Sequence, residues 1–181
     1  RGSYRNEGCS DGPDEIRKYF YGLHDIDKPL NIVDLGNIHP GERIEDTYAA
    51  IRTVTEDLLR AGIIPLILGG SQDLTYANYM AYESMEQTVN LVTIDPRLDF
   101  GGDPTQLHAR NYLNRIVLHQ PNYLFNYSNI GQQRYLVDKD LIELMEKMFF
   151  DLHRLGEVQE RVSDAEPVLR NADMVSIDMS V

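Results

Sequence analysis

Apolar residues recur along this chain at two different spacings, which separate predicted helices from predicted strands. A spacing of three to four residues places apolar side chains on one face of a helix. Residues 141–155 show this spacing most strongly. Residues 43–61 show it too, and Gly62 stands where a helix usually ends. Gly12-Pro13 opens an earlier helix, because proline suits the first helical turn. Further helices are predicted from Tyr76 to Met80, over 108–119 and around 164–171.

Short apolar runs between these helices have the character of buried strands. Strands covered on both faces of a parallel sheet read as continuous apolar runs, as in IIPLIL at 63–68. Strands separated by helices imply βαβ units. The pattern therefore predicts an α/β fold over residues 1–181, a single three-layer, doubly wound domain with a mainly parallel sheet. The predicted strands are 31–37, 63–68, 91–95, 123–130 and 174–178.

The charge of the chain narrows its possible partners. There are 29 acidic against 17 basic residues, and the formal net charge is -12. This balance disfavours nucleic acids and acidic membrane surfaces, because both bind positively charged proteins. The longest apolar run is far shorter than the roughly 20 residues of a membrane helix. We therefore expect no nucleic-acid or membrane partner. The lone Cys9 cannot form an internal disulfide, which leads us to expect a cytoplasmic protein.

Polar clusters follow three of the predicted strands. The carboxyl ends of parallel strands meet at one edge of the sheet, where open α/β proteins bind ligands. Asp95, Asp99 and Asp178 would then converge, and carboxylate oxygens suit hard cations such as Mn²⁺ and Mg²⁺. Each aspartate could instead cap the turn or helix after its strand. The clusters are GGSQD (69–73), DPRLD (95–99) and DMS (178–180).

These clusters resemble the metal-binding motifs of the ureohydrolase superfamily, which contains arginases, agmatinases and formimidoylglutamases. The family motifs are Gly-Gly-Asp-His-Ser, Asp-Ala-His-x-Asp and Ser-x-Asp-x-Asp, and each stands at a strand end. Their order and spacing match GGSQD (69–73), DPRLD (95–99) and SIDMS (176–180). Gly12-Pro13 with Ile16-Arg17 also resembles the first helix of the family. The resemblance covers nearly the whole chain and favours the formimidoylglutamase-like branch. It implies an arginase-like fold, a two-manganese centre and hydrolysis of a guanidino or formimidoyl C–N bond.

Only half of the six metal-ligand positions implied by the resemblance keep their ligand type. The retained ligands are Asp95, Asp99 and Asp178. Gln72 and Arg97 replace histidines of the first two motifs, and Ser180 replaces the last aspartate. An amide or hydroxyl oxygen is a weak ligand, and arginine has no lone pair to donate. Both manganese ions should therefore bind poorly, and we expect weak or absent activity.

Arg97 suggests how the remaining aspartates could be stabilised. Three clustered carboxylates repel one another, and a guanidinium donates hydrogen bonds to carboxylates in pairs. We therefore predict that Arg97 takes the place of the missing cation in a metal-free ion-pair network. The alternative is that Arg97 points away and an altered metal site persists.

His108 is the candidate catalytic residue outside the motifs. The stretch LHARNYLNRI (107–116) loosely resembles a family segment in which some members carry a proton-shuttling histidine. A histidine near the start of a helix could equally be an ordinary surface residue.

Three functions remain open at this point. The chain is predicted to be a ureohydrolase-family protein with a degenerate dimanganese site, a pseudoenzyme in effect. Alternatively, it is an active amidine hydrolase with an altered metal set, or a non-catalytic binding or assembly subunit. Its ligand would be a small guanidino- or amidine-bearing molecule, and the resemblance implies a homo-oligomer. We also expect residues 1–181 to lack the first strand and the C-terminal part of the full family domain.

Overall fold

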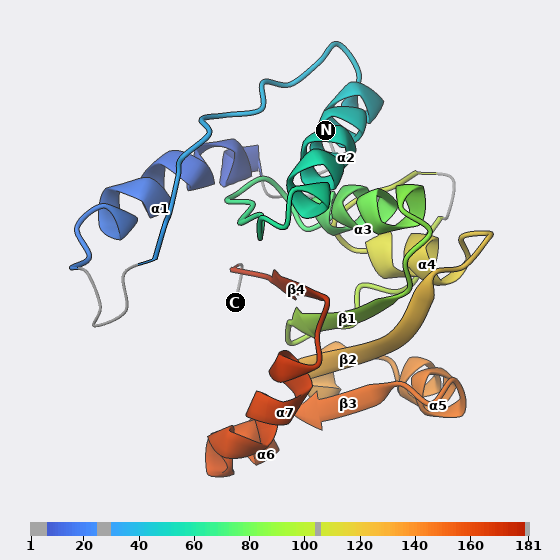
Figure 1. Cartoon of the computed structure of the whole chain (residues 1–181). Coiled ribbons are helices and arrows are strands. Elements are labelled where there is room, and N and C mark those ends of the chain that lie inside the picture. Colours follow the sequence, from blue (N-terminus) through green and yellow to red (C-terminus); the bar gives the residue numbers. More distant parts are fainter. Residues whose placement is uncertain (1–6, 25–29, 104–105, 180–181) are drawn as a thin grey trace.

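A parallel sheet forms the centre of the molecule. The structure, a computed structural model, describes residues 7–24, 30–103 and 106–179. In these residues four parallel strands lie side by side in the order β3-β2-β1-β4 (Figure 1). The chain steps outward from β1 to β3 and then crosses back, so that β4 lies beside β1. The strands are β1 (Val89–Ile94), β2 (Leu124–Gln132), β3 (Asp151–Arg154) and β4 (Met174–Ile177).

Helices cover both faces of this sheet, which confirms the predicted three-layer α/β fold. Figure 1 shows α3 and α4 on one side of the strands and α6 and α7 on the other. Helix α2 packs on α3, outside the sheet. No described helix has the length and apolar character needed to cross a membrane. The helices are α1 (Gly12–Phe20), α2 (Ile44–Arg60), α3 (Leu74–Ser84), α4 (Tyr112–Val117), α5 (Lys139–Lys147), α6 (Leu155–Glu160) and α7 (Ala165–Arg170).

The largest group of buried apolar side chains lies between the sheet and helices α3, α4 and α5. Register places Leu91 of β1 opposite Tyr127 of β2 and Met174 of β4, so these side chains share one face. Tyr79, Leu113, Ile116 and Met145 cover this face from the helices. The strands of the sheet are therefore held in place by a packed apolar core.

Replacing Leu113 by alanine should destabilise the protein by about 2–5 kcal/mol, because it leaves a cavity in this core. The neighbouring Leu118 is exposed, and Leu118→Ala should change the free energy of unfolding by less than about 0.5 kcal/mol. Urea unfolding of both variants measures this difference. Equal losses would show that α4 does not pack on the sheet.

Two of the predicted strands are wrong. Residues 31–37 and 63–68 have no regular secondary structure, and within the described ranges neither pairs with the sheet. Their apolar side chains are correspondingly open to solvent, and Ile64 is 92% exposed. An apolar run has the spacing of a strand, but a strand also needs a partner for its backbone groups. The remaining three predicted strands correspond to β1, β2 and β4.

Two helix predictions also need correction. The helix expected over 141–155 is divided into α5, β3 and α6, because the chain turns at Phe149, which has a φ of 60°. Leu152 therefore lies in a strand rather than on a helical face. Helix α4 begins at Tyr112, later than the expected residue 108, because residues 106–111 form a loop.

The turn before α3 depends on two glycines. Gly69 and Gly70 have φ values of 77° and 76°, which favour glycine. A Cβ atom at Gly69 would also lie 2.3 Å from the ring of Pro13. The N-terminal segment thus packs closely on this turn, and the backbone N–H of Gly70 donates to the carbonyl of Cys9 at 3.3 Å.

Candidate metal centre

Three aspartates meet at the carboxyl ends of two neighbouring strands. Asp95 follows β1 directly, and Asp178 follows β4. The strands bring these two together, since the backbone N–H of Asp178 donates to the carbonyl of Ile94 at 3.1 Å. Asp99 completes the group, in which one carboxylate oxygen of each residue lies within 4.8 Å of the others. The convergence expected from the sequence is therefore present, while the role of these residues as metal ligands stays a prediction.

Asp95 and Asp99 are buried, with 3% and 5% of their surface exposed. Burial raises the pKa of Asp95 to about 6, although the backbone N–H of Arg97 donates to its Oδ1 at 2.7 Å. Burial and the charge of Asp95 raise the pKa of Asp99 to about 8. Asp99 also has a left-handed backbone, with a φ of 41°. Two buried carboxyl groups this close are unfavourable without a positive charge between them.

The donor set fits one hard divalent cation. Among the described residues, Oδ2 of Asp95 and both carboxylate oxygens of Asp99 accept no hydrogen bond. Buried carboxylate oxygens without donors are available to a cation, and Mn²⁺ and Mg²⁺ prefer oxygen ligands. A second cation would need further ligands. In the family motifs these are histidines, but Gln72 offers only a neutral amide oxygen and Arg97 has no lone pair to donate.

Arg97 does not pair with the aspartates, so the predicted ion-pair network is wrong. Its guanidinium donates from Nη1 to the carbonyl of Leu136 at 3.3 Å. No ion pair joins it to Asp95, Asp99 or Asp178 in the described part of the chain. The backbone explains this outcome. The N–H of Arg97 closes the turn onto the Asp95 carboxylate, and the side chain reaches Leu136 in the short 3-10 helix Arg134–Leu136, which follows β2.

The cation that faces the cluster is Arg110, which sequence reasoning missed. Its Nη1 lies 3.8 Å from Oδ1 of Asp99, and its side chain is 37% exposed. This arginine lowers the pKa of Asp99 only partly, because burial dominates. The nearest sequence signal was its place in the stretch 107–116, but nothing in the pattern distinguished it from the other arginine there.

Removing the Arg97 guanidinium should hardly affect the metal site. We expect Arg97→Gln to change the dissociation constant of Mn²⁺ by less than about threefold, because the guanidinium contacts a carbonyl and not the carboxylates. Calorimetric titration at pH 8 measures the change. A tenfold gain in affinity would show that Arg97 competes with the metal after all.

Gln72 is held by a hydrogen bond to β4. Its Nε2 donates to Oγ of Ser176 at 2.6 Å, and Oγ1 of Thr75 lies 2.6 Å from the same oxygen. These contacts join the start of α3 to β4. Ser180, the third substituted position, falls outside the described residues.

His108 lies in the loop before α4, two residues from Arg110. Its Nδ1 accepts a hydrogen bond from the backbone N–H of Arg110 at 3.0 Å. The histidine is half-buried. Its hydrogen bond to the backbone of Arg110 helps to hold the loop from which Arg110 faces Asp99. Its catalytic role stays a prediction.

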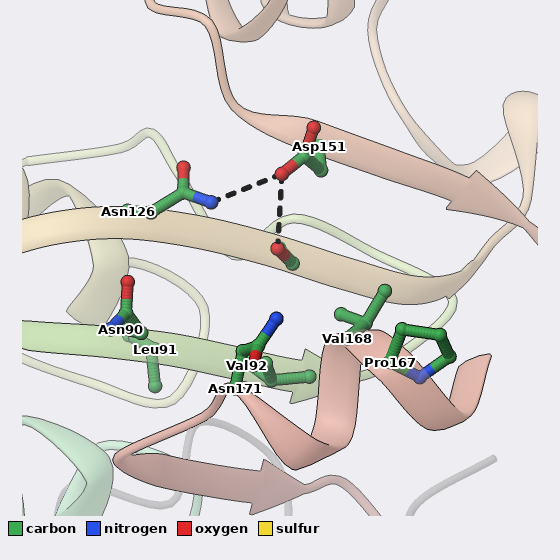
Figure 2. A pocket seen from close by; sticks show the side chains of 9 residues that line it. Asn90, Leu91, Val92, Asn126, Asp151, Pro167, Val168 and Asn171 are labelled. Atoms are coloured by element: carbon green, nitrogen blue, oxygen red, sulfur yellow. Dashed lines mark hydrogen bonds between the residues drawn. The ribbon is translucent and has the colours of Figure 1, made fainter. Parts of the chain in front are cut away.

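A cavity in the described part of the chain lies apart from this cluster. It has a volume of about 200 Å³ and lies between α7 and the sheet (Figure 2). Asn126 and Ser128 donate to Oδ2 of Asp151 in its wall, at 3.0 and 3.4 Å. Open α/β sheets bind ligands at the carboxyl ends of their strands, so the aspartate cluster remains the stronger candidate.

Comparison with known proteins agrees with this geometry. The sequence model of the Arginase family matches residues 1–181. A formimidoylglutamase of Staphylococcus aureus (strain MRSA252) is 32% identical over 95 residues, covering 51% of this chain and 30% of that protein.

Solved structures show the same fold. The formiminoglutamase of Trypanosoma cruzi, as its N114H variant with Mn²⁺₂, has a TM-score of 0.82 at 18% identity. That match covers 95% of this chain and 66% of the other. The formimidoylglutamase of Bacillus subtilis has a TM-score of 0.77 at 19% identity, covering 99% and 62%. The chain thus spans less than a third of the curated relative it matches and about two thirds of these solved structures.

Proposed function

This chain belongs to the arginase family, and from that premise we propose that its aspartate cluster is a reduced metal centre. Asp95, Asp99 and Asp178 hold a single divalent cation, where relatives such as the formiminoglutamase of Trypanosoma cruzi are described with Mn²⁺₂. The observation that carries the proposal is the convergence of three carboxylates, two of which, Asp95 and Asp99, are buried and have oxygens that accept no hydrogen bond among the described residues.

The family relationship supports a proposal for the substrate class. The curated relative and the two solved structures described above are formimidoylglutamases or formiminoglutamases, so we propose a small formimidoyl or guanidino compound as the ligand. A divalent cation bound here would lower the pKa of a water molecule, which could then attack the carbon of the formimidoyl or guanidino C–N bond. The chain's own contribution is to bring three carboxylates together at one edge of the sheet, two of them buried.

Hydrolysis should be weak, because three ligand positions of the family motif are substituted. A single cation leaves one side of the substrate without the charge that a second cation would provide. Arg110 is the positive group of the chain that lies nearest to Asp99 among the described ion pairs. An arginine can bind a carboxylate of the substrate but cannot activate water.

Restoring the family ligands tests this proposal. The combined variant Gln72→His, Arg97→His and Ser180→Asp should raise bound manganese from one to two ions per chain. Its hydrolysis of formimidoylglutamate, agmatine, arginine or guanidinobutyrate should increase at least about tenfold over the unmodified chain. Metal analysis and steady-state assays with added Mn²⁺ measure both effects. A variant that binds a second ion without faster hydrolysis of any of these compounds would contradict the proposed function.

A further inference from the structure

The turn that carries two of the cluster's aspartates is fixed by hydrogen bonds from β2. This segment, Asp95–Asp99, is called the aspartate turn below. The amide nitrogen Nδ2 of Asn129 lies 3.1 Å from the carbonyl oxygen of Asp95 and 3.1 Å from that of Arg97. The backbone N–H of Gln133 donates to the carbonyl between them, that of Pro96, at 3.0 Å. Three consecutive carbonyls of the turn therefore accept hydrogen bonds from one neighbouring strand and its end.

Asn129 is completely buried, which makes these contacts energetically important. A buried carbonyl that loses its donor costs about 1–3 kcal/mol. Within the Asn129 amide, only the N–H groups on Nδ2 can donate to these carbonyl oxygens, because Oδ1 is an acceptor. The amide orientation is therefore fixed, with Nδ2 toward the turn, and Oδ1 accepts no hydrogen bond within the described ranges.

The hydroxyl groups of Thr93 and Tyr127 form a hydrogen-bonded pair next to the side-chain amide of Asn129. Oγ1 of Thr93 lies 3.1 Å from Nδ2 of Asn129 and 2.8 Å from the hydroxyl oxygen of Tyr127. All three side chains are buried. The network thus connects the packed centre of the sheet to the aspartate turn and leaves the amide little freedom to rotate.

We propose that Asn129 is a positioning residue for the metal centre, orienting the carboxylates of Asp95 and Asp99 toward Asp178 through the backbone of the aspartate turn. Asn129 acts through carbonyl groups and does not itself contact a cation or a substrate. This role of Asn129 rests on one part of the proposed function, namely that the aspartate cluster binds a cation. Asn129 is completely buried, and a buried amide needs hydrogen-bond partners that compensate for its burial.

The test compares two asparagines of β2. Asn129→Leu removes the donors and keeps the approximate side-chain size. Asn126→Leu is the matched control, since the amide of Asn126 donates to Asp151 and not to the turn. With both variants shown to be folded by urea titration, Asn129→Leu should weaken Mn²⁺ binding at pH 8 at least tenfold. It should also alter the Mn²⁺ electron paramagnetic resonance spectrum. Asn126→Leu should change the affinity by less than twofold.

A variant that only loses stability gives a different result. Thr93→Val removes a hydroxyl from the same buried network but leaves the carbonyl contacts, so it should lower stability and keep Mn²⁺ affinity within about threefold. If Asn129→Leu does not fold, Asn129→Ala replaces it with the same expectation. A folded Asn129 variant with unchanged Mn²⁺ affinity and spectrum would overturn the proposal.

A metal-free measurement separates this proposal from the proposed function. The backbone N–H of Arg97 donates to Asp95 within the turn, so its hydrogen exchange reports whether the turn is held. Exchange should accelerate at least tenfold in Asn129→Leu and remain unchanged in Asn126→Leu. If the unmodified protein binds no Mn²⁺, the proposed function fails, and this exchange rate alone decides the role of Asn129. Unchanged exchange would then refute it.

Discussion

Replacing Asp99 by asparagine should abolish the stabilisation that Mn²⁺ gives to the folded protein. A ligand that binds only the folded state, at a free concentration 100 times its dissociation constant, adds about 2.7 kcal/mol to the free energy of unfolding. Asp99 supplies a buried carboxylate without donors among the described residues, so its loss removes a central ligand. In the Asp99→Asn variant the gain should be below about 0.5 kcal/mol, measured by urea unfolding with and without Mn²⁺.

The matched control is Asp57→Asn on α2, which removes one exposed carboxylate far from the cluster in sequence and environment. It should retain the full gain, because non-specific binding to an acidic surface contributes little. An Asp99→Asn protein that is still stabilised by Mn²⁺ to the same extent would show that the metal binds elsewhere.

The second large effect concerns pH in the metal-free protein. Asp99 has a pKa of about 8 in the folded protein, mainly through burial, against an ordinary value of 3.8. Between these values the folded state keeps a proton that the unfolded chain has lost. The free energy of unfolding must therefore fall as pH rises from about 4 to about 8. Asp95, with a pKa of about 6, adds to the fall in the lower part of this interval.

The loss from Asp99 alone should be on the order of 5 kcal/mol, since one pKa unit corresponds to about 1.4 kcal/mol. Urea unfolding at a series of pH values, in the presence of a chelator, measures it. Asp99→Asn should flatten the curve above pH 6, because the amide does not titrate. Saturating Mn²⁺ should reverse the trend, since the metal binds the deprotonated carboxylates more tightly as pH rises. Stability that rises from pH 5 to pH 8 without metal would contradict the burial of these groups.

The sequence predicted the aspartate cluster because its cause is local. An apolar run followed by a carboxylate places that carboxylate at a strand end, and parallel strands bring such ends together. Asp95 and Asp178 follow β1 and β4 in this way, and the two strands are neighbours in the sheet. Asp99 belongs to the same polar cluster after β1 as Asp95, DPRLD (95–99), and was predicted together with it.

The surroundings of the cluster could not be predicted, because they depend on side-chain direction and on contacts between distant segments. Arg97 stands between two aspartates in the sequence, yet its side chain points to Leu136. Arg110 is further away along the chain but faces Asp99 from the loop before α4. The strand predicted at 63–68 failed for a related reason: apolar spacing indicates that a segment can be buried, but not whether a partner strand is present.

Asp95, Asp99 and Asp178 are proposed to form a centre for one divalent cation. The most direct test is the stoichiometry of manganese, measured by metal analysis and electron paramagnetic resonance after equilibration with Mn²⁺ at pH 8.5 and removal of unbound metal. One ion per chain in the unmodified protein, and none in Asp99→Asn, is the predicted result. No bound manganese, or two coupled ions per chain, would contradict the account.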